Sequence, residues 1–183
     1  DNVGAMMNQG FEASFRGVIF ERENFHWDAT AMVSLNRNKV KSITSSQDVI
    51  NYGSMVIEVG KPIYTFYMSK SAGVSPETGK QLYYAYYRYA VDESGAMITE
   101  RCPEYVTDNV GLASLSKYYY GSRQALFSGS FASNFVIFKN FDLSFLTTYS
   151  VGGKILDGLY NGAMNVTYAG NNWHKNKLRR WRK

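Results

Sequence analysis

The 183-residue sequence predicts an all-β fold whose strands each have one apolar and one polar face. Three observations support this prediction. Four segments alternate between apolar and polar residues with a period of two, the spacing at which side chains return to one face of a strand. Aromatic residues make up 16% of the chain, with 15 Tyr and 11 Phe, as β-rich folds favour. The connections between the segments are short at one end and long at the other.

The first two strands are expected at about residues 9–20 and 25–37, joined by about four residues around Glu21–Asn24. Odd positions of the first strand are apolar or small: Phe11, Ala13, Phe15, Gly17 and Ile19. Odd positions of the second strand are apolar: Phe25, Trp27, Ala29, Ala31, Val33 and Leu35. The even positions of both strands are mostly polar, so one face of each strand suits a nonpolar environment and the other suits water.

The third and fourth strands are expected at about residues 123–138 and 142–152. Their apolar face carries Phe127, Phe131, Phe135, Leu143 and Phe145. Opposite residues in a hairpin share a face, so an odd residue must pair with an odd residue, which excludes a two-residue turn. The rule predicts a three-residue loop, Lys139–Phe141, closed by Phe138 and Asp142.

The long connections, at about residues 38–122 and 153–183, lie at the end opposite the short turns. Such asymmetry is typical of outer-membrane β-barrels, and each strand has more than the roughly 9–11 residues needed to cross a bilayer at a tilt. A soluble sheet would instead bury its apolar face under a second layer. The pattern therefore favours a segment of an antiparallel transmembrane β-barrel with long extracellular loops.

The first long connection contains two further alternating segments, Pro62–Ala72 and Gln81–Tyr89, around a turn at Ser75–Gly79. One interpretation is two more membrane strands. However, Lys70 and Arg88 interrupt the apolar pattern, and tyrosines occupy both faces. These departures favour a hairpin that stands above the membrane.

The net charge of +5 belongs to the C-terminal end of the chain. Residues 171–183 hold six of the 20 Lys and Arg and no acid, so the rest of the chain carries 14 basic and 15 acidic residues. A nucleic-acid-binding domain would spread positive charge over one face, so no nucleic-acid partner is expected. On a helical wheel, Trp173, Leu178 and Trp181 share one side. This arrangement predicts either an amphipathic helix on a membrane surface or a helix docked by its tryptophans.

No combination of residues indicates catalysis. Nucleotide-binding, zinc-protease and serine-hydrolase motifs are missing from the sequence. Cys102 is the only cysteine, which excludes an internal disulfide and a CxxC motif. His26 and His174 are the only histidines, so a zinc site is not expected. His26 and Asp28 are interpreted as a structural pair on the polar face. The chain is therefore not expected to be an enzyme or to hold a metal or a cofactor.

Tyrosines cluster in the predicted loops. Those within 83–87 are expected to pack inside their own hairpin. Those at 118–120, just before the third strand, form either a belt at the membrane interface or a surface that stacks on a ligand or partner. The candidate ligand or partner contacts are Tyr118, Tyr119, Tyr120 and Trp173.

Five motifs occur in the order found in SusC/RagA-type TonB-dependent transporters, and this resemblance spans essentially the whole chain. The motifs cover Asn2–Glu12, Phe25–Val40, Ala72–Lys80, Lys139–Ile155 and Asn171–Lys183. The most specific pieces are Asn-Phe-Asp-Leu-Ser at 140–144 and Asn-Trp-His-Lys at 172–175. Ser75 departs from the family, which usually has Asp at this position of a G-x-D-P-x-T-G turn.

The resemblance implies a barrel of about 22 strands in the bacterial outer membrane, with an N-terminal plug domain in its lumen. This chain would correspond to about the sixteenth to nineteenth strands, in the C-terminal half of the barrel. The plug domain and the final strands would lie outside it. The family imports oligosaccharides, or peptides in some relatives, with a SusD-like surface lipoprotein as partner. TonB acts on the plug, and therefore through the absent N-terminal part.

In such a barrel the polar face would line the lumen or contact the plug, and the apolar face would contact outer-membrane lipid. The residues expected to face the lumen are Glu12, Arg16, Asp28, Thr30, Asn134, Asp142, Ser144 and Thr148. One alternative is a soluble or secreted all-β module that presents its tyrosine-rich loops to glycans. A weaker alternative is a porin or autotransporter barrel that does not depend on TonB.

Overall fold

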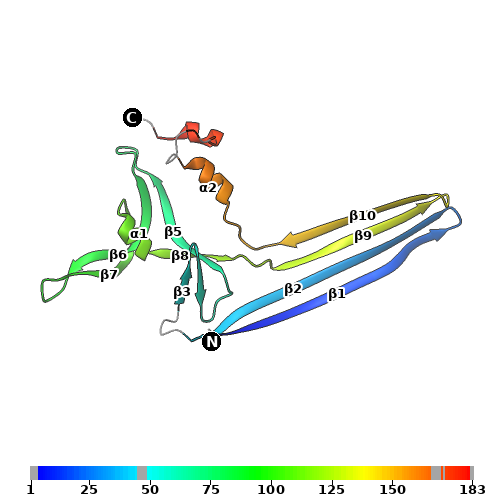
Figure 1. Cartoon of the computed structure of the whole chain (residues 1–183), viewed down its shortest axis with the longest axis horizontal. Helices are drawn as coiled ribbons and strands as arrows, with labels where there is room; N and C mark the ends of the chain where they lie inside the picture. The colour runs from blue at the N-terminus through cyan, green and yellow to red at the C-terminus, as the bar shows by residue number, and fades with distance from the viewer. Residues whose placement is uncertain (1–3, 45–48, 166–169, 171, 182–183) are drawn as a thin grey trace. The chain divides into compact units, whose positions relative to one another are not determined.

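The structure is a computed structural model that describes residues 4–44, 49–165, 170 and 172–181. Its contacts divide the chain into two compact units, residues 1–66 with 121–154, and residues 67–120 with 155–183. Both units contain antiparallel strands (Figure 1), and the predicted all-β fold is confirmed. Within the described part of the chain, each helix is too short or too polar to cross a membrane.

The first unit contains a four-stranded antiparallel sheet with the order β1-β2-β9-β10, whose long strands lie side by side in Figure 1. The strands are β1 (Gly4–Arg22), β2 (Phe25–Ile43), β9 (Phe127–Ile137) and β10 (Phe141–Val151). From β2 through β9 to β10, odd residues pair with odd residues, as in the row Trp27, Phe135 and Leu143. The rows therefore keep most apolar side chains on one face and most polar side chains on the other, as predicted.

The hairpin of β1 and β2 is longer than that of β9 and β10. β2 pairs with β9 only from Phe25 to Ser34, and it continues to Ile43, beyond the expected strand end at residue 37. Beyond Ser34 it pairs with β1 alone. At the start of β9, residues 123–126 lie outside the strand, although they were expected within the third strand. β9 and β10 have 11 residues each, which is about 36 Å of strand and enough to cross a bilayer at a tilt.

Both short turns differ from the prediction in position. β1 and β2 are joined by two residues, Glu23 and Asn24, rather than about four. The loop between β9 and β10 has the predicted three residues, but they are 138–140, closed by Ile137 and Phe141. Positive φ angles at Phe138 (51°) and Lys139 (61°) explain the shift, because two such residues in succession are what a type I′ turn requires. The prediction placed Phe138 in the strand, where a positive φ is not expected.

A β-bulge changes the faces near the end of β1. Val18 pairs with Asp28, but Phe20 pairs with Trp27, so Ile19 is the extra residue. The insertion moves Phe20 to the apolar face, where its ring lies 5.7 Å from that of Phe25. The assignment of Ile19 as the last member of a regular alternation is therefore wrong.

The far end of the long hairpin is packed against a small apolar core. Val40 donates a backbone hydrogen bond to Lys61 and accepts one from Gly60. β3 (Val49–Tyr52) pairs with β4 (Met55–Glu58), and β4 pairs with the first residues of β5 (Thr65–Val74). The core is built around the buried side chains of Val40, Val56 and Phe66. This part of the unit buries its apolar residues, unlike the four-stranded sheet.

The second unit is built on β5, β6 (Gln81–Val91) and β7 (Met97–Thr107), which pair in that order. The predicted hairpin around the 75–80 turn is therefore present as β5 and β6. Helix α1 (Val110–Leu115) follows, capped by the Asn109 side chain, which accepts a hydrogen bond from Leu112 N. β8 (Lys117–Ser122) comes next.

The C-terminal residues of this unit dock on the β5–β6 turn. Ser75 Oγ accepts a hydrogen bond from Thr78 N at 3.2 Å, so the serine side chain stabilises the turn. Trp181 Nε1 donates to Pro76 O at 2.9 Å. Upstream, α2 (Gly158–Met164) and the 3-10 helix η1 (Lys175–Arg179) end before Trp181. The described residues 172–181 therefore form a short 3-10 helix followed by a docked tryptophan, not a continuous amphipathic helix.

Candidate functional site

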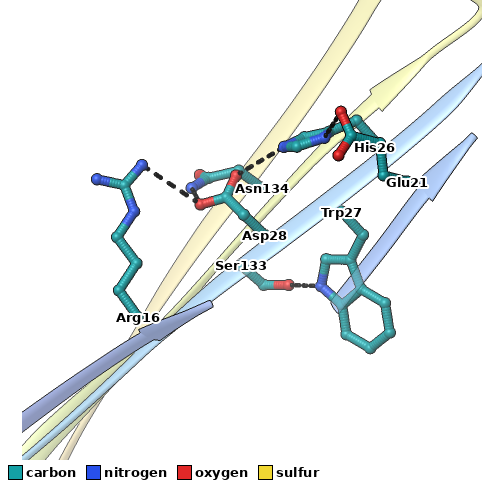
Figure 2. A network of polar contacts seen from close by, with 7 residues as sticks. All are labelled: Arg16, Glu21, His26, Trp27, Asp28, Ser133 and Asn134. Carbon is teal, nitrogen blue, oxygen red and sulfur yellow. Dashed lines mark hydrogen bonds and ion pairs between the residues drawn. The ribbon is translucent and has the colours of Figure 1, made fainter. Parts of the chain in front are cut away.

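A network of polar side chains occupies the polar face of the four-stranded sheet near the short turns (Figure 2). Asp28, whose side chain is 13% exposed, is at its centre. Its Oδ1 accepts a hydrogen bond from Asn134 Nδ2 at 3.1 Å and lies 3.7 Å from an Arg16 guanidinium nitrogen. Asn134 is opposite Asp28 in the register, and Arg16 is diagonal to it. The structure therefore brings together three residues that were expected to share this face.

His26 lies between two carboxylates at the edge of the same network (Figure 2). Its Nε2 is 3.8 Å from Asp28 Oδ2, and its Nδ1 is 3.7 Å from Glu21 Oε1. The bulge at Ile19 makes this possible, because it places Glu21 opposite His26. Regular alternation would put Glu21 on the apolar face, so the sequence analysis missed its part in the network.

The other residues expected on the polar face also lie on it. Glu12 Oε1 accepts a hydrogen bond from Ser34 Oγ at 3.1 Å. The remaining four are distributed along the sheet, with Thr30 opposite Arg16, Ser144 opposite Asn134, Asp142 opposite Val136 and Thr148 opposite Ser130. They share the face, but no direct hydrogen bond links them to the network of Asp28.

The opposite face carries an aromatic cluster at the same level. The Trp27 and Phe135 rings stack at 5.4 Å, and Phe145 lies 5.5 Å from Phe135. Trp27 Nε1 donates to Ser133 Oγ at 2.8 Å, so the buried serine on this face is paired (Figure 2). Trp27 and Phe135 lie near the turns, where barrels place the aromatic residues of a membrane interface, and Phe145 extends the cluster toward the middle of β10.

The loop tyrosines lie in the second unit, and most of them pack against or hydrogen-bond to residues of that unit. Tyr118 donates to Glu104 Oε2 at 2.7 Å, and Lys70 Nζ lies 3.4 Å from the same oxygen. Burial raises the pKa of Tyr118, and its hydrogen bond to Glu104 raises that pKa further. The same bond lowers the pKa of Glu104. The Tyr118 hydroxyl is therefore bonded within its own unit, and its role as a ligand or partner contact stays a prediction.

The neighbouring candidates are more accessible. The Tyr119 ring packs on that of Tyr67 at 4.7 Å and is 47% exposed. Tyr120 and Trp173 are also exposed. Their role as ligand or partner contacts stays a prediction.

Ser116 is a buried residue that the sequence analysis missed. It is fully buried, and its Oγ accepts from Tyr86 N at 2.9 Å and from Tyr87 N at 3.2 Å. These amides sit at an irregularity of β6, where the pairing with β7 shifts between Ala85 and Tyr87. A bulge frees amides that need a partner, and such a bulge has no simple sequence signal.

The side chains of the polar face form a polar surface. In the residues that the structure describes, no three His, Cys, Asp or Glu side chains gather as metal ligands. Among the described residues, the sheet combines one exposed apolar face with one networked polar face, and its strands are antiparallel with short turns at one end. These properties define a segment of an antiparallel transmembrane β-barrel.

Comparison with known proteins places this segment. The sequence matches no known family model and no curated protein. Its fold is similar to part of the RagAB peptide transporter, with a TM-score of 0.73 and 23% identity over 100% of this chain and 19% of that chain. The RagAB peptide importer in its closed-closed state gives a TM-score of 0.60 at 25% identity, over 83% of this chain and 16% of that chain. Its open-open state gives 0.58 at 22%, over 83% and 15%.

The chain thus spans about a fifth of the length of the transporter chain that it matches over its whole extent. The resemblance to SusC/RagA-type transporters that the motifs predicted is confirmed at the level of the fold.

Proposed function

We propose that this chain is a segment of a TonB-dependent transporter in the bacterial outer membrane, which imports peptides or oligosaccharides. The observation that carries the proposal is the apolar face of the four-stranded sheet, opposite a polar network, which no described residue layers over. A soluble protein rarely leaves so many large apolar side chains exposed in one continuous patch. Lipid would cover that face in a barrel, whereas a secreted glycan-binding module would need a second protein layer.

In this proposal the polar face lines the lumen or contacts the plug domain. Arg16, Asp28 and Asn134 form the networked part of that wall, and Asp142, Ser144 and Thr148 form its edge on β10. TonB would act on the plug, outside this chain. No bond is made or broken, so the protein has no enzymatic role of its own.

The partner would be a SusD-like surface lipoprotein at the extracellular mouth. The similar solved structures are of RagAB, an assembly described as a peptide transporter and importer, which supports a two-component system and favours peptide as cargo. Oligosaccharide stays an alternative cargo because the resembling family includes glycan importers.

Uptake by cells tests the proposal. Cells that carry the full-length protein and its SusD-like lipoprotein should import a fluorescent peptide or oligosaccharide, and cells without the protein should not. Collapse of the proton gradient should abolish uptake, because TonB draws on that gradient. Membrane fractionation should recover the protein in the outer membrane, with release only by detergent. A protein recovered in the soluble fraction would instead support the glycan-binding module, and gradient-independent uptake would support a simple porin.

A further inference from the structure

A groove of about 750 Å³ crosses the polar face of the four-stranded sheet, away from the short turns. One wall is the row Glu12, Ser34, Ser128 and Ser150, which are successive partners across β1, β2, β9 and β10. The row two residues closer to the turns forms the other wall. Side chains of the row between them point to the opposite face, so their backbone is the floor. The groove therefore lies entirely on the polar face and within one unit.

Six of the eight side chains in the two walls are Ser or Thr. The second wall contributes Ser14, Ser130 and Thr148, with Met32 as its one apolar member. A hydroxyl both donates and accepts, so the walls offer hydrogen bonds of either polarity about 4.8 Å apart across the strands. This pattern suits an extended polymer, whether its polar groups are peptide N–H and C=O or sugar hydroxyls.

Charge distinguishes the two kinds of polymer. Glu12 is the one residue of the groove lining that carries a charge at neutral pH. Its carboxylate accepts a hydrogen bond from Ser34, but across the described ranges no Lys, Arg or His forms an ion pair with it. Arg16, the nearest cation along β1, forms its ion pair with Asp28, at 3.7 Å. An unmatched carboxylate in a hydroxyl-lined groove attracts an ammonium group, which a peptide carries at its N-terminus and a neutral oligosaccharide does not.

We infer that this groove is a contact site for extended cargo that bears an ammonium group. Glu12 pairs with the ammonium, and the Ser and Thr hydroxyls bond the polymer that follows it. The inference rests on the proposed function, because it requires the polar face to line the path of the cargo. It adds the residues of a wall site and a preference for free amino groups.

Competition uptake by cells with the full-length protein tests the inference. Two versions of one peptide with uncharged side chains, one with a free and one with an acetylated N-terminus, are supplied together at low concentration. The ratio of their uptake is measured. Glu12→Gln should lower the ratio of free to acetylated peptide about fivefold, the equivalent of about 1 kcal/mol for an exposed ion pair. The ratio does not depend on how much protein reaches the membrane. Glu23→Gln, the same change in the exposed β1–β2 turn, should leave it unchanged.

An unchanged ratio in Glu12→Gln would overturn the inference, as would an equal change in Glu23→Gln. Import of neutral oligosaccharide but of neither peptide would also overturn it, while the proposed transport function stands. Uptake of neither class by the wild-type protein would overturn both.

Discussion

The four-stranded sheet and the tyrosine-rich hairpins of residues 67–120 use aromatic residues in opposite ways. On the sheet, Phe11, Phe15 and Phe145 are 63%, 69% and 47% exposed, with no covering layer among the described residues. In the hairpins, Tyr105 and Tyr118 donate hydrogen bonds to partners inside the same unit. The sheet therefore depends on a nonpolar environment, whereas the hairpins supply their own interior.

This difference determines which substitutions each region tolerates. In the proposed barrel, lipid rather than protein solvates the apolar face of the sheet, so this face should reject charge. The hairpins should be most sensitive where a buried polar group would lose its partner.

The largest effect is expected on the apolar face of β10. Phe145→Arg should destabilise the full-length protein folded in lipid vesicles by about 2–4 kcal/mol, because the charge would lie in hydrocarbon near the bilayer midplane. Ser144→Arg, one residue away on the polar face, should cost much less. The free energy of unfolding in urea measures both. Equal tolerance of the two changes would mean that the two faces of β10 do not differ in their surroundings.

The next largest effect is expected at Ser116. Ser116→Ala removes the acceptor of the Tyr86 and Tyr87 amides and should cost about 1–3 kcal/mol locally, since buried donors would lack a partner. Hydrogen exchange at these two amides should accelerate accordingly. Ser114→Ala, at an exposed position of α1, is the matched control and should leave exchange unchanged. Similar rates in both variants would mean that the hydroxyl does not hold the bulge.

A smaller effect is expected where the C-terminal segment docks. A Cβ on Gly79, whose φ is +72°, would lie 2.5 Å from Trp181 Cε3. Gly79→Ala should displace the tryptophan, and trypsin should cleave within 175–180 several times faster. Gly95 has a similar φ of +82° but nothing within 4 Å of its Cβ position, so Gly95→Ala shares the backbone strain of about 1–2 kcal/mol without the clash. Equal cleavage in both variants would contradict the docking.

The smallest effect is a pH dependence of the hairpins. Burial raises the pKa of Tyr86 to about 12, above its usual value of 10. The folded state therefore favours the protonated phenol, and its contribution to stability is full below pH 10 and is lost as the pH rises toward 12. The ultraviolet difference titration between the wild type and Tyr86→Phe should show a phenol that ionises near 12. Ionisation near 10 would mean that the phenol is open to water.

The sheet was largely predictable because its pairing follows a period of two. From Phe25 to Leu35 each odd residue is apolar, and the structure keeps them on one face. What the sequence could not reveal is where that period breaks. Ile19 looks like a regular member of its strand, yet the bulge there moves Phe20 and Glu21 to new faces.

The turn of β9 and β10 was predictable in length but not in position, because positive φ at Phe138 and Lys139 runs against the preferences of both residues. The hairpins were less predictable still. β7 carries Arg101, Cys102 and Pro103 in its interior and has no clear alternation. The buried role of Ser116 depends on contact between segments about 30 residues apart, which local patterns do not encode.

The central claim is that lipid covers the odd face of the sheet and water reaches the even face. Spin labels at single cysteines from 142 to 150, in a Cys102→Ser background and in native outer membranes, test it most directly. Oxygen, which concentrates in lipid, should reach labels at odd positions such as 143, 145 and 147. A water-soluble nickel complex should reach even positions such as 144, 146 and 148. Equal access of both probes along the strand, or the reverse alternation, would mean that lipid does not cover the odd face.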